Sequence, residues 1–359
     1  MLNMPYPQSI LLIYHATPRV IGLNYEKAFQ QLGCHVLTVD IATSERIPVI
    51  QCSPAVDLTE LISQLALQPD VVIYFESRGF FPQGWEKLTI PRIWYSTEGD
   101  VNFSIHSQMV PFFDVLFSSN KVIAERFAQQ GFSSYWLPLA VDADIHYPRD
   151  MEPSDEIVFV GTLNMIQYSE RARLVKRLQD YFQVQVITQA TPQECAMAYA
   201  KAKLVFDKSL GHGINTRPFE TLACRRLLLT ESDPHSGIFD LFQDEKHLIY
   251  YREEELLEKV RFYLDHPRER ERIAAAGYEW VLEKHTYLHR AKQMLDIIRQ
   301  ETSFGVSLTS KQKQLYSSPE KLALTYAHVY SYENILEPAH QILLPYQHLP
   351  EANMLLGLV

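Results

Sequence analysis

Short apolar runs and amphipathic stretches alternate along the first 140 residues. Unbroken apolar runs are typical of parallel strands covered on both faces, whereas apolar residues spaced three and four apart indicate helices. The apolar runs predict strands at residues 9–14, 35–39, 71–75, 92–95, 115–118 and 134–137. The intervening stretches predict helices at residues 25–32, 57–67 and 120–130. This order of elements predicts a doubly wound α/β domain.

The alternation stops at residues 138–156, which are rich in proline and acidic residues and are typical of a linker. It then restarts with predicted strands at residues 157–160, 184–187, 204–206, 227–230 and 248–250. Helices are predicted at residues 168–181, 192–200, 218–223, 253–264, 269–285 and 288–300. We therefore expect an α/β fold of two Rossmann-like domains, residues 1–140 and 141–300, that face a cleft. Residues 301–359 are predicted to form a helical tail that either packs back on the N-terminal domain or serves as an interaction segment.

Composition and charge exclude several classes of protein. With 47% apolar and 21% charged residues the chain is neither disordered nor low in complexity, and its net charge of −10 argues against a nucleic-acid binder. Residues 160–230 nevertheless carry ten basic and five acidic side chains, which fits either a solvated face or the surroundings of a small anion such as phosphate. The four cysteines lack metal-ligand spacing, and no apolar run approaches a membrane span. We therefore expect a cytoplasmic protein with reduced thiols.

The most informative stretch is residues 204–231, LVFDKSLGHGINTRPFETLACRRLLLTE, in which a strand leads through a glycine-containing loop into a helix. Glycines permit close approach of a ligand to the backbone, and the start of a helix attracts an anion. Arg217 is then a candidate phosphate donor, and Glu220 a candidate acceptor of hydrogen bonds from a ribose diol. The alternative is an ordinary strand–helix turn in which Arg217 pairs with Glu220 on the surface.

The phrase GINTRPFETLACRRLLLTE resembles the nucleotide-sugar site of the CgeB-like (spore maturation protein) branch of group 1 GT-B glycosyltransferases. The segments VFVGTLN, SERARLVKRL and LPLAVDADIHYP, and the closing helices from residue 247 to residue 290, resemble the same branch. The resemblance covers residues 130–300 well and residues 1–130 only in outline. It implies that the second domain binds the donor and that Glu220 binds the ribose. The other donor-site residues that it implies are Gly161, Thr162, Lys208, Gly213, Ile214, Asn215, Thr216 and Arg217.

The resemblance has one departure in the same loop. Many retaining relatives carry a glutamate eight positions before the helix glutamate, where this chain has His212. A histidine can donate a hydrogen bond to a sugar hydroxyl or a phosphate, so His212 remains a catalytic candidate, but the stereochemical outcome is left open. The further catalytic candidates are Glu98, Asp100 and His106, which follow a predicted strand of the first domain and offer a general base for the acceptor.

These features together predict a hexosyltransferase-like enzyme that moves a sugar from a UDP- or GDP-type donor to an unidentified acceptor, either a glycan, a protein or a small molecule. No cofactor, metal or nucleic acid is expected; the Asp142-Ala-Asp144 sequence has the form of a metal-binding Asp-x-Asp motif but lies in the linker. Two alternatives remain open. The first is a nucleotide-sugar epimerase on the same fold, and the second is a glycosyltransferase-like module that binds its ligand with weak or no catalysis.

Overall fold

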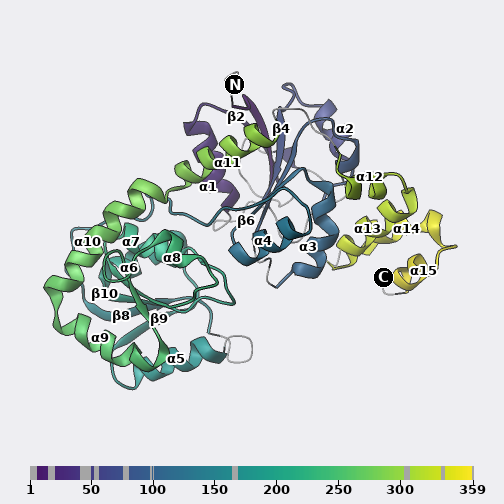
Figure 1. The fold of residues 1–359 in the computed structure, drawn as a ribbon. Coiled ribbons are helices and arrows are strands. Elements are labelled where there is room, and N and C mark those ends of the chain that lie inside the picture. Colours follow the sequence, from purple (N-terminus) through teal and green to yellow (C-terminus); the bar gives the residue numbers. More distant parts are fainter. Residues whose placement is uncertain are drawn as a thin grey trace. The chain divides into compact units, whose positions relative to one another are not determined.

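The computed structural model describes residues 6–14, 21–40, 50–51, 56–75, 81–97, 99, 101–163, 169–302, 308–332 and 336–357. The chain divides into two units (Figure 1). The first contains residues Met1–Leu137 together with Ala291–Val359, and the second contains residues Pro138–Arg290. The expected division at residues 140 and 300 differs mainly at its second point, because helix α11 (Tyr287–Thr302) continues into the first unit. There the Tyr6 hydroxyl donates to Asp296 of α11 at 2.8 Å.

The first unit is built on a parallel sheet whose described strands have the order β3-β2-β1-β4-β5-β6-β7. Their bounds are β1 (Ser9–Ile13), β2 (His35–Asp40), β3 (Ile50–Gln51), β4 (Val71–Tyr74), β5 (Arg92–Ser96), β6 (Val115–Ser118) and β7 (Ser134–Trp136). The side chains of β1, β4 and β6 are buried along the whole strand, as expected for strands covered on both faces. Every strand that the apolar runs predicted here is present. The two-residue β3 carries no such run and was not predicted.

Helices α1 (Ile21–Gln31), α2 (Leu58–Ser63) and α4 (Lys121–Gln129) follow the strands as predicted, and α1 begins four residues before the predicted start. Helix α3 (Phe103–Met109) was not predicted, because its sequence FSIHSQM lacks a clear apolar stripe. Side chains cap two of these helices: Asp57 accepts from the Thr59 amide at 2.9 Å, and Asn120 accepts from the Ile123 amide at 3.3 Å. Short 3₁₀ helices η1 (Trp85–Lys87) and η2 (Val110–Phe112) complete the first 137 residues.

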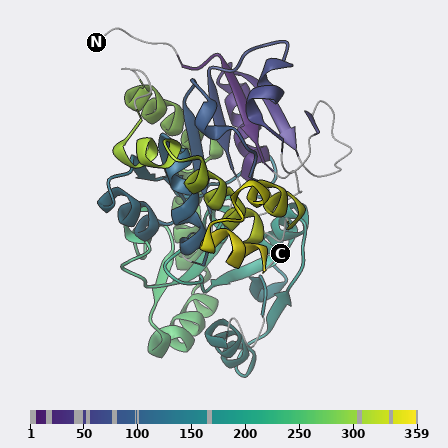
Figure 2. The same cartoon turned by 90° about the vertical axis from the view of Figure 1, so that its right-hand side faces the viewer.

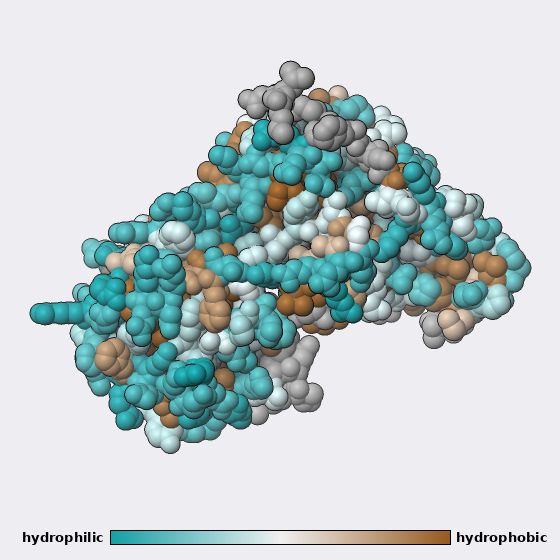
Figure 3. Space-filling model, viewed as in Figure 1, coloured by the Kyte–Doolittle hydropathy of each residue, from teal (hydrophilic) through white to brown (hydrophobic). Residues whose placement is uncertain are grey.

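The C-terminal tail packs on the first unit. Its helices are α12 (Ser310–Tyr316), α13 (Pro319–Tyr332), α14 (Leu336–Leu343) and α15 (Pro350–Leu356), with η4 (Leu344–Tyr346) between the last two. Helix α13 lies beside α3 (Figures 1 and 2), and Tyr326, Val329 and Tyr330 of α13 belong to the main core of the unit. The last helices also expose apolar side chains, among them Leu344 and Met354, and brown patches lie over this end of the molecule (Figure 3).

The second unit is built on a smaller parallel sheet of the order β12-β11-β10-β8-β9. Its strands are β8 (Asp155–Val160), β9 (Val184–Ile187), β10 (Ala202–Asp207), β11 (Leu227–Glu231) and β12 (Ile249–Tyr251). Its helices are α5 (Ser169–Gln179), α6 (Pro192–Lys201), α7 (Arg217–Ala223), α8 (Ile238–Leu241), η3 (Glu253–Glu255), α9 (Leu256–Asp265) and α10 (Pro267–Lys284). Helix α10 lies close to α7 because Gly277 has no side chain: a Cβ there would stand 2.7 Å from Leu222 and 2.3 Å from the His247 carbonyl oxygen.

A buried arginine joins the tail to the sheet of the first unit. The Arg92 side chain at the start of β5 is fully buried and pairs with Asp114, to which its Nε donates at 2.9 Å. Its Nη1 donates to the Tyr316 hydroxyl of α12 at 3.1 Å and to the Trp85 carbonyl at 3.2 Å. Among the described residues, every helix is too short or too polar to cross a membrane.

We expect Arg92→Ala to lower the free energy of unfolding of the first unit by about 3–5 kcal/mol, because it leaves Asp114 without its buried partner. Urea denaturation followed by tryptophan fluorescence measures this change. The control is Lys87→Ala, which removes an exposed pair with Asp57 and is expected to cost less than about 1 kcal/mol. Equal midpoints for Arg92→Ala and the wild type would contradict the role given to Arg92.

Candidate functional site

The candidate site lies at the carboxyl edge of the second unit's sheet. Strands β8, β10 and β11 are neighbours and run parallel, so the residues that follow them meet at one edge. These residues begin at Gly161 after β8, Lys208 after β10 and Ser232 after β11. Ligands of open parallel sheets bind beyond this edge. The structure thus brings the segments that hold the predicted donor-site residues to the place where the fold positions a ligand.

A buried carboxylate organises the loop between β10 and α7. Asp207 is fully buried and its Oδ1 accepts from Asn215 Nδ2 at 3.0 Å and from the Arg217 guanidinium. Its Oδ2 accepts from the Thr230 hydroxyl at 2.8 Å and from Ser209 at 3.4 Å. Asn215 closes the network, since its Oδ1 accepts from the Arg217 amide at 2.8 Å and its Nδ2 also donates to Ser209 Oγ at 3.0 Å. The conformation of the loop therefore depends on Asp207.

Arg217 is part of this support and is not exposed toward a ligand. Its guanidinium pairs with Asp207, and its Nε donates to the Val160 carbonyl at the end of β8 at 3.1 Å. The guanidinium also lies 4.9 Å from the ring centre of Phe159. Gly161 makes room for it, because a Cβ at that position would stand 2.8 Å from Arg217 Nη2. The side chain is thus committed to protein groups, since a buried guanidinium requires a carboxylate partner, and the expected role as a phosphate donor stays a prediction.

Lys208 is likewise held by carboxylates. Its Nζ lies 2.5 Å from Glu231 Oε2 and 3.2 Å from Glu170. Burial lowers the pKa of Lys208, but the hydrogen bonds to these two carboxylates outweigh burial and raise the pKa above its usual value. Arg171 of α5 connects the segments that follow β8 and β10, because it donates to the Thr162 carbonyl at 3.3 Å and to the Lys208 carbonyl at 2.9 Å. The ammonium is therefore charged, and a phosphate would have to share it with two carboxylates.

Glu220 is the predicted ribose-binding residue, and its carboxylate is loosely held. The Tyr199 hydroxyl of α6 donates to Oε2 at 3.4 Å, and His146 Nε2 lies 3.9 Å from Oε1. The side chain of Glu220 is 18% exposed, whereas His146 and Tyr199 are buried. His146 and Tyr199 therefore contact the Glu220 carboxylate from the buried side, and its remaining lone pairs are left for a ligand.

The loop before α7 presents unused backbone donors. In the part of the chain that the structure describes, the backbone N–H groups of Ile214, Asn215 and Thr216 donate to no protein acceptor, whereas the Gly213 amide donates to the Leu210 carbonyl at 3.2 Å. The Ile214 side chain is buried, which anchors this run of amides. Helix α7 itself has only seven residues, so the three loop amides, and not a long helix dipole, are the groups that suit an anion.

His212 stands at the exposed end of the same loop. Its Nδ1 lies 3.0 Å from Asp233 Oδ2, and its ring packs edge-on against His235 at a centroid distance of 5.1 Å. Asp233 follows β11 and also accepts from the His235 amide at 2.9 Å. The pairing with Asp233 places a proton on Nδ1 and orients the ring, so Nε2 is the nitrogen that is left for a ligand.

The catalytic candidates of the first unit are only partly described. Glu98 and Asp100 lie outside the described residues. His106 is fully buried in α3, where its Nδ1 lies 3.0 Å from Ser96 Oγ and its ring packs edge-on against Trp94. His106 therefore lies among buried side chains in this structure, and its expected role as a general base stays a prediction.

The Asp-x-Asp sequence forms a turn in the segment that leads into the second unit. Asp142 Oδ1 accepts from the Asp144 amide at 2.9 Å, which is the geometry of a local turn. Among the described residues, no group of three or more His, Cys, Asp and Glu side chains is arranged to hold a metal ion.

Sequence reasoning missed three residues of the site: Asp207, His146 and Tyr199. Asp207 had a signal, because an aspartate directly after a buried apolar strand requires a partner. His146 and Tyr199 lie in the linker and in α6, far from the loop in sequence, and only the folded chain brings them to Glu220.

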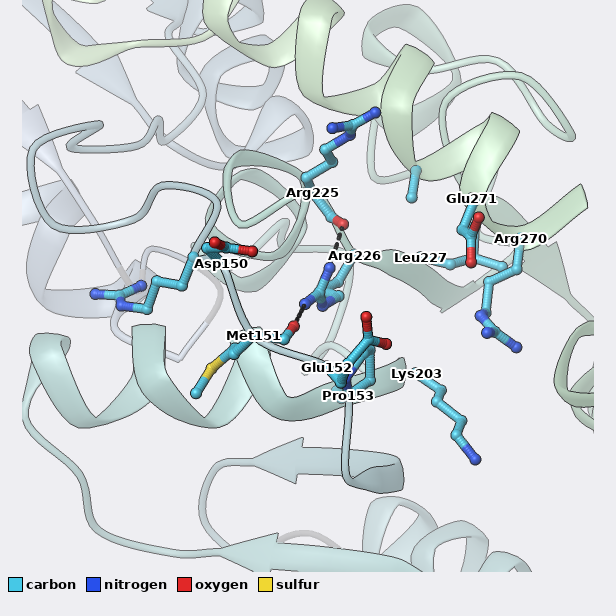
Figure 4. Close-up of a pocket in the computed structure, with 13 residues that line it drawn as sticks. Asp150, Met151, Glu152, Pro153, Lys203, Arg225, Arg226, Leu227, Arg270 and Glu271 are labelled. Carbon is cyan, nitrogen blue, oxygen red and sulfur yellow. Dashed lines mark hydrogen bonds between the residues drawn. The ribbon is translucent and has the colours of Figure 1, made fainter. Parts of the chain in front are cut away.

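A separate cavity of about 360 Å³ lies at the opposite, amino edge of this sheet (Figure 4). Its basic side chains mainly hold the backbone. Arg226 donates to the Ala200 carbonyl at 2.7 Å and to the Met151 carbonyl at 3.4 Å, and Arg270 donates to the Tyr263 carbonyl at 2.9 Å. Figure 4 shows Arg226 beside Met151, with a hydrogen bond between them. This cavity contains none of the predicted site residues.

Comparisons with known proteins agree with this architecture. Residues 149–296 match a protein-family model described as "Glycosyl transferase-like". No curated protein matches the chain. One similar solved structure is a glycosyltransferase from Rickettsia africae ESF-5, which is 10% identical over 82% of this chain and 98% of that one, with a TM-score of 0.59. Another is Anabaena HepE in complex with UDP-glucose, which is 12% identical over 81% of this chain and 99% of that one, with a TM-score of 0.58. Sucrose-phosphate synthase from Thermosynechococcus elongatus is also similar, with 13% identity over 82% of this chain and 98% of that one and a TM-score of 0.57. The chain therefore has the α/β GT-B glycosyltransferase fold that the sequence led us to expect.

We expect Asp207→Ala to lower the free energy of unfolding of the second unit by about 3–5 kcal/mol, because Arg217 then stays buried without a carboxylate. Chemical denaturation followed by circular dichroism measures the change. Thr230→Val removes one hydroxyl from the same carboxylate at nearly constant volume, and should cost about 1 kcal/mol. If both variants cost the same, Asp207 does not have the central role that the contacts indicate.

Proposed function

We propose that this protein is a glycosyltransferase that takes its sugar from a nucleoside-diphosphate donor bound at the carboxyl edge of the second unit. One observation carries the proposal: a partly exposed carboxylate, Glu220, and three unused loop amides lie on either side of the start of α7. A ribose diol donates to a carboxylate, and a diphosphate accepts from amides, so this pairing suits a nucleoside diphosphate. The family match over residues 149–296, which contain this edge, supports the same assignment.

The chemistry follows from the charge that develops in the reaction. As the glycosidic bond breaks, the departing nucleoside diphosphate gains negative charge, and donors that are already in place lower the barrier. The amides of Ile214, Asn215 and Thr216 are fixed by the Asp207 network and need no rearrangement. His212 is proposed to donate from Nε2 to a phosphate or a sugar hydroxyl as the doubly protonated imidazolium, whose other proton, on Nδ1, stays on the Asp233 carboxylate.

The remaining assignments belong to the same proposal. Gly161, Thr162 and Gly213 border the donor, the Lys208 ammonium is shared between the donor phosphates and its two carboxylates, and Arg217 acts through the shape of the loop. The donor is of the UDP or GDP type, which the UDP-glucose bound to the similar Anabaena protein supports for UDP. Glu98 and Asp100 of the first unit stay candidates for the general base that activates the acceptor.

We expect UDP or GDP to raise the melting temperature of the protein, and Glu220→Ala to abolish this shift, because the ribose loses its acceptor. A thermal-shift screen with UDP, GDP, ADP and dTDP, alone and as sugar conjugates, measures the effect. Asp144→Ala, in the turn of the Asp-x-Asp sequence, serves as the control and should keep the wild-type shift. An unchanged shift in Glu220→Ala together with a lost shift in Asp144→Ala would move the site to the linker.

We expect His212→Phe, which removes the hydrogen-bond donor and keeps a ring, to lower the rate of donor-sugar cleavage by about 10²-fold while UDP binding stays close to that of the wild type, because the His212 hydrogen bond acts on charge that develops during the reaction. Release of nucleoside diphosphate from the nucleotide sugar measures the rate, with water or a panel of acceptors as the second substrate. Interconversion of the nucleotide sugar without cleavage would favour an epimerase instead, and tight binding without any turnover would favour a binding module.

A further inference from the structure

An unsatisfied histidine lies directly behind the carboxylate of the candidate donor site. His146 is 3% exposed, and within the described residues neither of its ring nitrogens reaches a partner at hydrogen-bond geometry. A buried polar group without a partner is costly, on the order of 1–3 kcal/mol, and such a group calls for a functional explanation. Its Nε2 lies 3.9 Å from Glu220 Oε1, just beyond hydrogen-bond distance.

The surroundings of His146 leave Glu220 as the partner that Nε2 faces. Its ring centre lies 6.4 Å from that of Tyr199 on α6, and the Tyr199 hydroxyl is directed at Glu220 Oε2. The other groups that act on the imidazole come from its own segment: the Asp142 backbone and carboxylate, which raise the pKa of His146, and Arg149, which lowers it. Arg149 is occupied by the carbonyls of Tyr147, Ile145 and Ala196.

We propose that His146 is a positioning residue of the donor site: its Nε2–H donates to Glu220 when a nucleotide is bound, and so fixes the carboxylate for the ribose diol. This inference rests on the proposed function, since it needs Glu220 to bind a ribose. A small rotation of the Glu220 side chain closes the 3.9 Å gap. The carboxylate is then held from the protein side by His146 and Tyr199, and both of its oxygens keep lone pairs for the two ribose hydroxyls.

The ionisation of His146 fits this role. Burial lowers the pKa of His146 below its usual value, although the Glu220 carboxylate acts in the opposite direction. The imidazole is therefore neutral at pH 7 and carries a single proton. A neutral donor orients the carboxylate without cancelling its charge, so Glu220 remains a strong acceptor for hydroxyl groups.

The test is a double-mutant cycle read out with two ligands, UDP and 2′,3′-dideoxy-UDP, which lacks both ribose hydroxyls. His146→Phe keeps an aromatic ring of similar size and removes the donor. We expect it to weaken UDP binding by about three- to tenfold, the loss of one hydrogen bond, and to leave dideoxy-UDP binding unchanged. In a Glu220→Gln background the same substitution should have no further effect. His146→Gln, whose amide can donate near the position of Nε2, should restore most of the affinity.

Three results would overturn this inference. Equal weakening of UDP and dideoxy-UDP binding by His146→Phe would mean that the ring only packs. Additive effects of His146→Phe and Glu220→Gln would separate the two residues. Should His146→Phe fail to fold, ¹⁵N NMR of the wild-type histidine with UDP bound still decides, because a proton on Nδ1 instead of Nε2 contradicts the proposal. Absence of any nucleotide binding by the wild type is a different outcome, which removes the proposed function itself.

Discussion

The buried pair of Asp207 and Arg217 is the interaction on which the candidate site depends. It joins the ends of β8 and β10 to the start of α7, because Arg217 reaches the Val160 carbonyl as well as Asp207. A charge taken out of water requires a partner, so neither residue can be moved or removed alone. Through Asn215 the same pair fixes the loop whose amides are proposed to bind the diphosphate. The hydrogen bonds that shape the loop are therefore all made by protein groups.

Several basic side chains of residues 160–230 pair with protein groups in the structure. Arg173 pairs with Glu253, Lys208 with Glu231, and Arg217 with Asp207. Arg171 and Arg226 donate to backbone carbonyls. These five of the ten cations thus contact protein groups, and the proposed site relies mainly on backbone amides and one carboxylate. Backbone amides in a fixed loop can stabilise a developing negative charge without the desolvation cost of a buried cation.

The tail is an integral part of the first unit. Arg92 and Gln312 connect α12 to the sheet, since Gln312 Nε2 donates to the Phe113 carbonyl at 3.0 Å. The aromatic side chains of α13 fill the space beside Trp85 and Phe112, where Tyr326 lies 4.9 Å from the Phe112 ring. Removing the tail would expose this aromatic face, so the first unit needs both ends of the chain to complete its core.

The sequence by itself determined the two parallel sheets, their strands and most helices, because apolar runs and helical spacing are local properties of the chain. It also identified the loop from Gly211 to Glu220, since glycines, an asparagine and a proline mark a strand–helix turn in any context. It did not predict α3 or the side-chain partners in the site. Arg217 was expected to face a phosphate, and the fold instead placed it against Asp207. His146 and Tyr199 lie 74 and 21 residues before Glu220 in the chain, and only packing of the folded chain brings them to it. These contacts join residues that are far apart in the sequence, and the sequence offers several possible partners for each of them. Which partner a side chain contacts is fixed only when the folded chain buries the two groups together.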